Sequence, residues 1–501
     1  MGRRASLHNL GCKVNAYETE AMEQLLKEAG YTVVAFGEPA DVCIINTCSV
    51  TNVADKKSRQ MLHRARVKNP GACVVAVGCY VQAAAAELEK DGSADILIGN
   101  NRKKDLVGIL ADYFREQERQ EQGRQEQERQ EQGRQEQKRQ EQGRQEQERQ
   151  EQGRQEQERQ EQGGRGQGCP ESVHIIDIGK TREYEELHVD QAPFHTRVPV
   201  KIQDGCDQFC SYCIIPYTRG RVRSRQIGDV VGEVEQLTAG GHKEVVLTGI
   251  HLSSYGSGLE GLEKGGPALL ELLGRLQKIS GLERIRLGSL EPRIVTEDFA
   301  AALAAMPKVC PHFHLSLQSG CEATLKRMGR RYTPREYQEV CSLLRRAFAR
   351  PAITTDVIVG FPGETEDEFE ETRRFLEGLG LYEMHIFKYS KRKGTRAAAM
   401  PDQVPEQVKA RRSEELLGLE RTLSRQFREG FLGQDIQVLL EEEAVIGKER
   451  YMVGHTREYV RAALPIKEGQ EPVRSCGKGC LVEGTGREIL TDDLLLFQLK
   501  W

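Results

Sequence analysis

Three closely spaced cysteines are the strongest chemical signal in this sequence. Cys206, Cys210 and Cys213 lie in the segment CDQFCSYC, just after a stretch with the pattern of a buried β-strand. Three thiolates at this spacing can bind one metal centre, and because such a centre usually takes four ligands, one position would stay open for a reactant. Structural zinc is the alternative, but it needs a fourth cysteine or histidine nearby, and none follows before His242.

A second set of cysteines is dispersed along the first part of the chain. Cys12, Cys48 and Cys79 each follow a predicted strand, in the segments LHNLGC, IINTC and VAVGC. Because the carboxyl ends of parallel strands share one edge of a sheet, we expect these thiols to converge there and again to leave one metal position open. Chance placement is the competing explanation. Cys43 and Cys73 lie within or at the start of strands, so we interpret them as small buried hydrophobic residues.

Several glycine-bearing loops near the predicted barrel strands are suited to holding a ligand. Gly240 and Gly241 precede a strand that ends at Thr248, and Gly360 ends a later strand. Glycine lets the backbone approach a ligand closely. We expect these loops to lie on the same face as the Cys206 motif and to bind a cofactor there; ordinary loop chemistry is the competing interpretation.

A run of arginines follows the Cys206 motif. Four arginines fall within residues 219–225, with Tyr212 and Tyr217 nearby. Such a run could grip phosphates and stack on a base of RNA. A solvated charged face is the alternative.

Three sections of the sequence must position these residues. Residues 1–113 alternate strand-like and helix-like segments, which predicts a parallel sheet with helices on both faces. Residues 192–430 repeat this alternation and predict a full or partial β/α barrel whose working face lies at the carboxyl ends of its strands. Residues 433–500 read as short strands between glycine-bearing turns, which predicts a small all-β barrel of the oligonucleotide-binding kind. The predicted fold class is α/β with an all-β C-terminal domain.

Residues 114–168 form a low-complexity linker of arginine, glutamine, glutamate and glycine with a ten-residue repeat. This tract has nothing to bury and cannot offset its ordering entropy. Because these side chains favour helices, a charged helix interrupted by glycines is the open alternative. The charges nearly cancel within each repeat, so an expanded repeat tolerated at a domain junction is favoured over an RNA tether.

Composition excludes several classes of protein. The net charge of -4 is incompatible with a histone-like polycation. No apolar run approaches the ~18 residues of a membrane span, and the N-terminus lacks the apolar stretch of a signal peptide. We therefore expect a cytoplasmic protein that does not bind membranes, in which the clustered cysteines among the fourteen bind metal or do chemistry rather than form disulfides.

Four motifs together resemble the methylthiotransferase family of radical S-adenosylmethionine (SAM) enzymes. They are NLGCKVN around Cys12, NTCSVT around Cys48, GCY around Cys79, and the Cys206 motif. The resemblance extends over nearly the whole chain except the repeat tract. It implies a methylthiotransferase N-terminal domain, a radical SAM barrel and a C-terminal TRAM domain. The segment LGCKVNAYET is most similar to the branch of the family that acts on threonylcarbamoyladenosine at position 37 of tRNA.

The resemblance also implies two 4Fe-4S clusters and SAM as cofactors. The cluster at Cys206, Cys210 and Cys213 would cleave SAM to a 5′-deoxyadenosyl radical, and the cluster at Cys12, Cys48 and Cys79 would hold the sulfur inserted at carbon 2 of the adenine. The regions of Gly240, Gly241 and Gly360 would contact SAM. The implied partners are tRNA, a flavodoxin- or ferredoxin-like electron donor and a sulfur source.

Three alternatives stay open from sequence. Isopentenyladenosine in tRNA or an aspartate of a ribosomal protein could be the substrate of the same chemistry. A non-catalytic RNA-binding protein with structural iron-sulfur clusters is the alternative from a different class.

Overall fold

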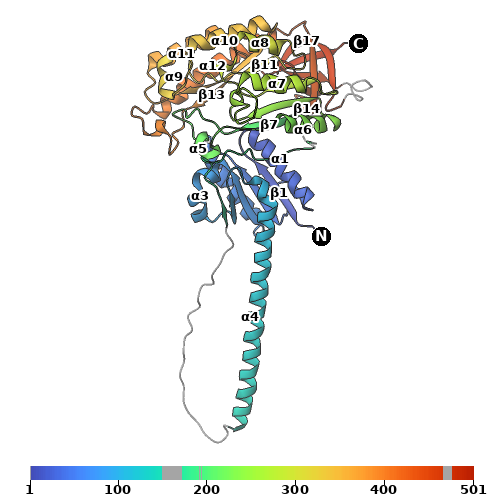
Figure 1. Ribbon diagram of the computed structural model, residues 1–501, viewed down its shortest axis with the longest axis vertical. Coiled ribbons are helices and arrows are strands. Elements are labelled where there is room, and N and C mark those ends of the chain that lie inside the picture. The colour runs from blue at the N-terminus through green and yellow to red at the C-terminus, as the bar shows by residue number, and fades with distance from the viewer. Residues whose placement is uncertain (1, 149–171, 191, 193–194, 467–476, 501) are drawn as a thin grey trace.

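The computed structural model describes residues 2–148, 172–190, 192, 195–466 and 477–500. An N-terminal α/β domain contacts a central β/α domain, and a small β-barrel packs beside that central domain (Figure 1). This arrangement confirms the predicted fold class. Within the described residues, no helix combines the length and apolar character needed to cross a bilayer.

The N-terminal domain is built on a six-stranded parallel sheet in the order β2-β1-β3-β4-β5-β6. Its central strands are buried along their whole length, as expected for a parallel sheet covered on both faces. The strands are β1 (Arg4–Asn9), β2 (Thr32–Val34), β3 (Val42–Thr47), β4 (Cys73–Gly78), β5 (Ile96–Ile98) and β6 (Val173–His174). Since β6 follows the repeat tract, this domain takes in residues on both sides of it.

The two faces of this sheet bury separate cores. Its helices are α1 (Lys13–Glu28), α2 (Asn52–Lys68), α3 (Cys79–Asp91) and the start of α4 (Leu106–Glu148). Along β4, Val75 and Val77 pack with α1 and α4, whereas Val74 and Ala76 pack with α2 and α3. Successive side chains of a strand point to opposite faces, which explains this division. Cys43 and Cys73 are buried in these cores, which confirms their prediction as small hydrophobic residues.

The helix α4 continues from the sheet into the repeat tract and extends away from the body of the protein (Figure 1). Leu106, Ile109 and Leu110 are buried against the sheet, whereas residues 121–137 are exposed. Helix propensity therefore decides the conformation of this part of the tract, and the helix continues through Gly123 and Gly133. Residues 149–168 of the tract lie outside the described residues.

The central domain is a half-barrel of six parallel strands with helices on its outer side (Figure 1). The strands are β7 (Arg197–Asp204), β9 (Glu244–Gly249), β10 (Arg284–Leu287), β11 (His312–His314), β12 (Ala352–Val359) and β13 (Glu383–Lys388). Bridges between the segments of β10 and β11 join the two sheets. The outer helices are α6 (Ile227–Ala239), α7 (Gly266–Leu276), α8 (Glu297–Ala304), α9 (Glu322–Met328), α10 (Pro334–Ala347) and α11 (Glu366–Leu379). The barrel is not closed between β13 and β7, because β7 pairs instead with the short antiparallel β8 (Arg223–Ser224).

The C-terminal domain is a closed barrel in the order β14-β15-β16-β18-β17, connected to the half-barrel by α12 (Glu406–Glu429). Its strands are β14 (Asp435–Ile446), β15 (Glu449–Thr456), β16 (Arg461–Pro465), β17 (Leu481–Thr491) and β18 (Leu494–Leu499). Arg284 of β10 donates to the carbonyls of Gln437 and His455, and Arg286 donates to that of Arg457. Because Arg284 begins β10 and Arg286 pairs with Val246 near the amino end of β9, the small barrel covers the amino-end side of the half-barrel.

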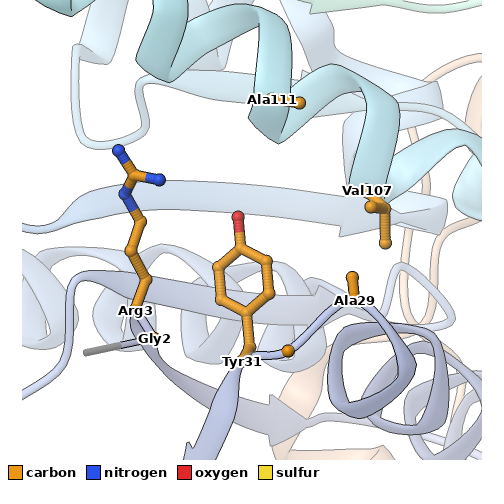
Figure 2. A pocket seen from close by; sticks show the side chains of 7 residues that line it. Gly2, Arg3, Ala29, Tyr31, Val107 and Ala111 are labelled. Atoms are coloured by element: carbon orange, nitrogen blue, oxygen red, sulfur yellow. The ribbon is translucent and has the colours of Figure 1, made fainter.

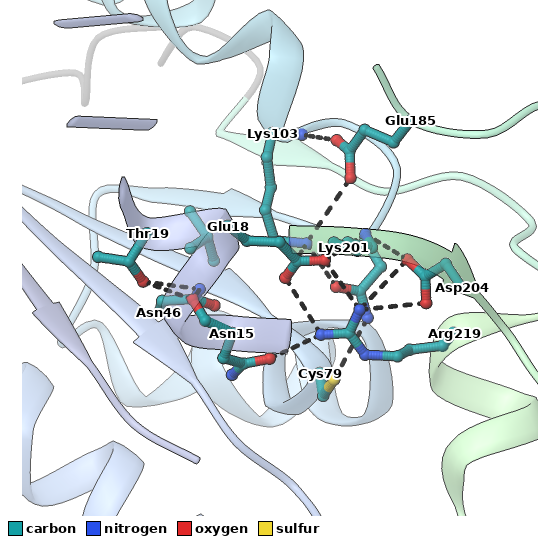
Figure 3. A network of polar contacts seen from close by, with 12 residues as sticks. Asn15, Glu18, Thr19, Asn46, Cys79, Lys103, Glu185, Lys201, Asp204 and Arg219 are labelled. Carbon is teal, nitrogen blue, oxygen red and sulfur yellow. Dashed lines mark hydrogen bonds and ion pairs between the residues drawn. The ribbon is translucent and has the colours of Figure 1, made fainter. Parts of the chain in front are cut away.

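A buried ion network joins the N-terminal domain to the half-barrel (Figure 3). The carboxylate of Glu18 on α1 is 2.8 Å from Arg219, 2.7 Å from Lys201 and 3.3 Å from Lys103. Asp204 at the end of β7 is 2.7 Å from Lys201 and 3.2 Å from Arg219. Charges removed from water must be paired. The network therefore fixes α1 against β7.

Replacing Glu18 by glutamine should destabilise the protein by about 3–5 kcal/mol, since three buried cations lose their shared carboxylate. Burial alone would raise the pKa of Glu18, but Arg219, Lys103 and Lys201 outweigh it and hold that pKa below its ordinary value. The stabilisation is therefore present above the ordinary value of 4.5 and is lost as the pH falls below it. Denaturant unfolding should show a large loss at pH 7 and a smaller one at pH 3.

The matched control is Glu28→Gln, an exposed position on the same helix, which should change the unfolding free energy by less than about 0.5 kcal/mol. Equal effects of the two substitutions at both pH values would contradict the role given to Glu18.

Removing the repeat should leave the fold intact, because its described part makes few contacts beyond the first turns of α4. Residues 119–168 are replaced by about ten glycine and serine residues, which span roughly 33 Å. The melting temperature of this variant should stay within about 2 °C of the parent, corresponding to a surface change of about 0.5 kcal/mol. Loss of the cooperative transition would mean that the tract is needed for folding.

Candidate functional site

The carboxyl ends of three neighbouring strands bring Cys12, Cys48 and Cys79 together. Cys48 directly follows β3, Cys79 is the first residue of α3 after β4, and Cys12 lies between β1 and α1. The loops are in contact, since a Cβ atom added to Gly11 would lie 2.8 Å from the Cys48 sulfur. Gly11 also has a φ of +107°, which other residues rarely adopt. The predicted convergence thus follows from the sheet order.

Polar side chains tie this triad to the half-barrel. Asn15 donates to the carbonyls of Leu10 and Thr47, and its own Oδ1 accepts from Arg219 at 2.6 Å. Asn100 donates to the Thr218 carbonyl at 2.7 Å and lies 3.5 Å from the Cys79 sulfur. Figure 3 shows Cys79 beside Arg219. The short helix α5 (Ile215–Arg219), which follows Cys213 closely, therefore ends at the first triad.

The second triad lies in the loop after β7, at the carboxyl end of the half-barrel. The loop is held by hydrogen bonds from the Cys206 amide to the Gly220 carbonyl and from the Ser211 amide to the Met328 carbonyl. Arg330 lies 3.3 Å from the Cys210 sulfur. These contacts fold the loop so that its three cysteine side chains lie near one another.

Burial keeps the thiols of Cys48, Cys206 and Cys213 protonated while no metal is bound. It raises the pKa of Cys206 to about 11 and that of Cys213 to about 12, and in the first triad it raises the pKa of Cys48 to about 11. Metal binding at either triad therefore releases protons.

The spacing of the thiols fits a multi-iron centre better than a single zinc ion. Tetrahedral zinc with bonds of about 2.3 Å holds its sulfurs about 3.8 Å apart. Among the described residues, the groups whose ligand atoms all lie within 4.8 Å are His314–Asp356–His385 and Glu28–His188–Asp190, and neither cysteine triad is that compact. Hydrogen-bond donors beside Cys79 and Cys210 are also typical surroundings of iron-sulfur clusters. Both triads therefore remain candidates to hold a 4Fe-4S cluster with one open position.

Two of the predicted cofactor loops lie on the same face as the Cys206 motif. Thr248 pairs in register with Lys201 near the carboxyl end of β9. Gly360 follows β12, with a φ of +71°, and its amide donates to Glu364. Both positions therefore remain candidates for contact with a cofactor at this face.

The placement expected for Gly240 and Gly241 is wrong. Both lie in the turn that closes α6 and precedes β9, at the amino end of the strands, because β9 runs parallel to β7 from Arg197↔Glu244 onward. Their amides donate to the carbonyls of Gln236 and Thr238. The glycines terminate a helix, which is a common use of this residue.

The arginine run is mostly an internal ion-pairing segment. Arg219 and Arg223 are buried beside Asp204, and Arg225 is buried with Glu233 at 2.5 Å. Among the four arginines of the run, only Arg221 is partly exposed. Arg219, Arg223 and Arg225 therefore neither grip phosphates nor form a solvated face, and both interpretations are wrong for them. These three arginines instead neutralise buried carboxylates.

A polar group beside the Cys206 motif was not identified from sequence. Gln208 donates to Glu291 at 3.1 Å and lies 3.4 Å from His251, which is 3.3 Å from Glu291. These residues follow β7, β9 and β10, so they share the face of the second triad. The position of His251, two residues after the end of β9, was the available signal.

The loop of residues 390–397 spans both triads and was also missed. Arg392 donates to Ser49, next to Cys48, at 2.6 Å and pairs with Asp55. Arg396 donates to the Phe209 carbonyl inside the Cys206 motif. Beside this loop, a hollow of about 410 Å³ is lined by Arg59, Tyr80, Tyr217 and Lys393, among others.

A second hollow lies away from the cysteines. Its volume is about 610 Å³, and it is lined by Arg3, Tyr31, Val107 and Ala111, among others (Figure 2). Arg3 precedes β1, whereas Cys12 follows the other end of that strand. This hollow is therefore separate from the candidate site.

Comparison with known proteins gives family matches over the two triad-bearing domains. Residues 200–376 match the radical SAM superfamily, and residues 4–99 match the uncharacterized protein family UPF0004. A likeness of fold is seen with TsrM, a radical SAM methyltransferase from Kitasatospora setae, at a TM-score of 0.50 and 16% identity, covering 77% of this chain and 75% of that one.

Two curated relatives match most of the chain. The chain is 37% identical to the threonylcarbamoyladenosine tRNA methylthiotransferase MtaB of Bacillus subtilis, over 92% of this chain and 90% of that protein. It is 32% identical to the tRNA-2-methylthio-N(6)-dimethylallyladenosine synthase of Carboxydothermus hydrogenoformans, over 89% and 90%. The names of these relatives differ in the nucleoside and agree in the methylthio product on tRNA. Together with the radical SAM match, they show that the chain belongs to the radical SAM tRNA methylthiotransferase family.

Proposed function

We propose that the protein converts N6-threonylcarbamoyladenosine at position 37 of tRNA to its 2-methylthio derivative. The observation that carries the proposal is the pair of open cysteine triads, tied together by α5 and Arg219. Identity to the Bacillus subtilis protein and the LGCKVNAYET segment favour this nucleoside over isopentenyladenosine. Both curated relatives described above are named for a tRNA substrate, and neither is named for an aspartate of a ribosomal protein.

Each triad receives a distinct role in the proposal. The cluster that binds SAM is held by Cys206, Cys210 and Cys213. Thr248 and Gly360 lie on the same face of the half-barrel and contact the bound SAM. Cys12, Cys48 and Cys79 hold the cluster that carries sulfur. When bound, these cofactors supply the radical and the sulfur needed at carbon 2 of adenine, whose C–H bond offers no acidic proton to an ordinary base.

Side chains around the triads hold these groups in place. Arg330 and Asn100 donate toward the sulfurs of Cys210 and Cys79, which stabilises thiolate charge in a buried setting. The loop of residues 390–397 fixes the distance between the triads because it contacts both. The proposal therefore treats the relative position of the two domains as part of the chemistry.

RNA binding is assigned to surfaces near this loop and to the C-terminal barrel. Lys393 is 95% exposed, and Tyr217 is half exposed beside it, which suits contacts to phosphate and base. The closed five-stranded barrel fits a TRAM domain. The proposal includes cytoplasmic tRNA, a flavodoxin- or ferredoxin-like electron donor and a separate sulfur source as partners.

The substrate is tested with three versions of one tRNA, carrying adenosine, isopentenyladenosine or threonylcarbamoyladenosine at position 37. Anaerobically reconstituted protein, SAM, sulfide and a strong reductant are added, and nucleosides are analysed by mass spectrometry. The methylthio product should form on threonylcarbamoyladenosine at least about tenfold faster than on the others, a difference of about 1.4 kcal/mol. Preference for isopentenyladenosine would overturn the assignment, and absence of 5′-deoxyadenosine would favour a non-catalytic RNA-binding protein.

The roles of the triads are separated by a triple Cys12/Cys48/Cys79→Ala variant. Its iron content should fall from about eight to about four per chain, since each 4Fe-4S cluster holds four irons. Reductive SAM cleavage should persist, while methylthio product disappears. The control is Cys43→Ala, a buried thiol of the same sheet, which should keep both iron and product. Product formation by the triple variant would refute the division of roles.

A further inference from the structure

The inner face of the half-barrel is partly exposed at its edge strand β13. Val357 and Val359 of β12 are buried in the core shared with the outer helices, so the alternate residues of the strand face inward. On that inner face Ile358 lies opposite Phe387 of β13, and Phe387 is 47% exposed. The interior therefore offers an accessible surface on which a base could stack.

The helix α1 lies next to this interior. It packs against β7 and contacts β9, and its first residue is Lys13, immediately after Cys12. Lys13 is exposed, and within the described parts of the chain no hydrogen bond or ion pair reaches its ammonium group. A cation beside one triad is thus available to a ligand.

The surroundings of Lys13 carry an excess of positive charge. The carboxylates there are already paired, Glu244 with Arg286 at 2.7 Å and Glu441 with Arg197 at 2.8 Å. The cations are Lys13, Arg197, Arg284 and Arg286, and the carboxylates are Glu244 and Glu441. Four positive charges against two negative ones leave room for an anion.

The positive charge around Lys13 shifts the pKa values of two neighbouring side chains. Burial raises the pKa of Tyr459, but Arg197 and Lys13 outweigh it and lower that pKa below its ordinary value. Burial, reinforced by Arg286 and Lys13, holds the pKa of His312 well below its ordinary range. Both effects are those of an electropositive interior, which attracts an anionic ligand.

We propose that Lys13 binds the carboxylate of the threonyl group and thereby selects threonylcarbamoyladenosine over nucleosides with an apolar N6 substituent. The inference rests on the proposed function. In adenine, carbon 2 and the N6-bearing carbon both flank N1, so a base whose carbon 2 faces Cys12 keeps its N6 substituent on the same side. The carboxylate of SAM is a poor candidate for this contact. Lys13 interacts electrostatically with Arg197 and Glu244, which begin β7 and β9, whereas the proposed SAM site lies at the carboxyl ends of these strands.

The test compares binding of a synthetic anticodon stem-loop RNA with the same RNA whose threonyl carboxylate is a methyl ester. The full chain with reconstituted clusters is used without reductant, so the readout is affinity rather than turnover. Wild type should bind the free acid at least about tenfold more tightly than the ester, in keeping with a charge-assisted hydrogen bond. Lys13→Met should abolish this ratio, and Lys13→Arg should retain most of it.

Lys27→Met, at the other end of α1, is the matched control and should leave the ratio unchanged. An unchanged ratio in Lys13→Met would overturn the proposal, and an equal loss for both RNAs would assign Lys13 to a phosphate instead. If Lys13→Met loses iron, Lys13→Gln provides the same comparison. If wild type methylthiolates threonylcarbamoyladenosine but binds the free acid and the ester equally, the inference about Lys13 is refuted and the proposed function stands. If wild type forms no product on threonylcarbamoyladenosine, the proposed function is refuted.

Discussion

Arg219 donates to the carboxylates of Glu18 and Asp204 in an interior from which water is excluded, and the arrangement of both cysteine triads depends on this interaction. The arginine comes six residues after Cys213, and its other contact, Asn15, comes three residues after Cys12. A buried guanidinium without its carboxylates would be costly. The pairing therefore couples correct docking of the N-terminal domain to the placement of the loop that carries the second triad.

Parallel sheet topology supplies the rest of the geometry. In both domains the cysteines follow strands, and strand ends in a parallel sheet share one edge. The same topology places two features at opposite ends of the half-barrel strands. The Cys206 motif lies at the carboxyl ends of the strands, and Arg284 and Arg286 bind the C-terminal barrel nearer their amino ends. The open flank between β13 and β7 is where the N-terminal domain can present its own triad.

Much of this fold could be predicted from local pattern. The buried runs of β3 and β4 and the alternation of the half-barrel are strong signals, and the difference between Cys43 within a strand and Cys48 after it was readable. What failed depended on distant partners. The glycines at 240 and 241 end a helix, and Arg219, Arg223 and Arg225 pair with carboxylates that sequence spacing does not reveal. The short β6 was missed because two residues carry no pattern and gain their place only by pairing with β5. The repeat has no apolar periodicity, so only intrinsic helix propensity could indicate the conformation of its described part.

The central claim is that each cysteine triad holds its own iron-sulfur cluster. Crystals grown without oxygen and measured at the iron absorption edge test it directly, because the anomalous signal locates the metal. The account predicts two iron clusters, one among Cys12, Cys48 and Cys79 and one among Cys206, Cys210 and Cys213. A single iron peak, or zinc at either triad, would contradict it.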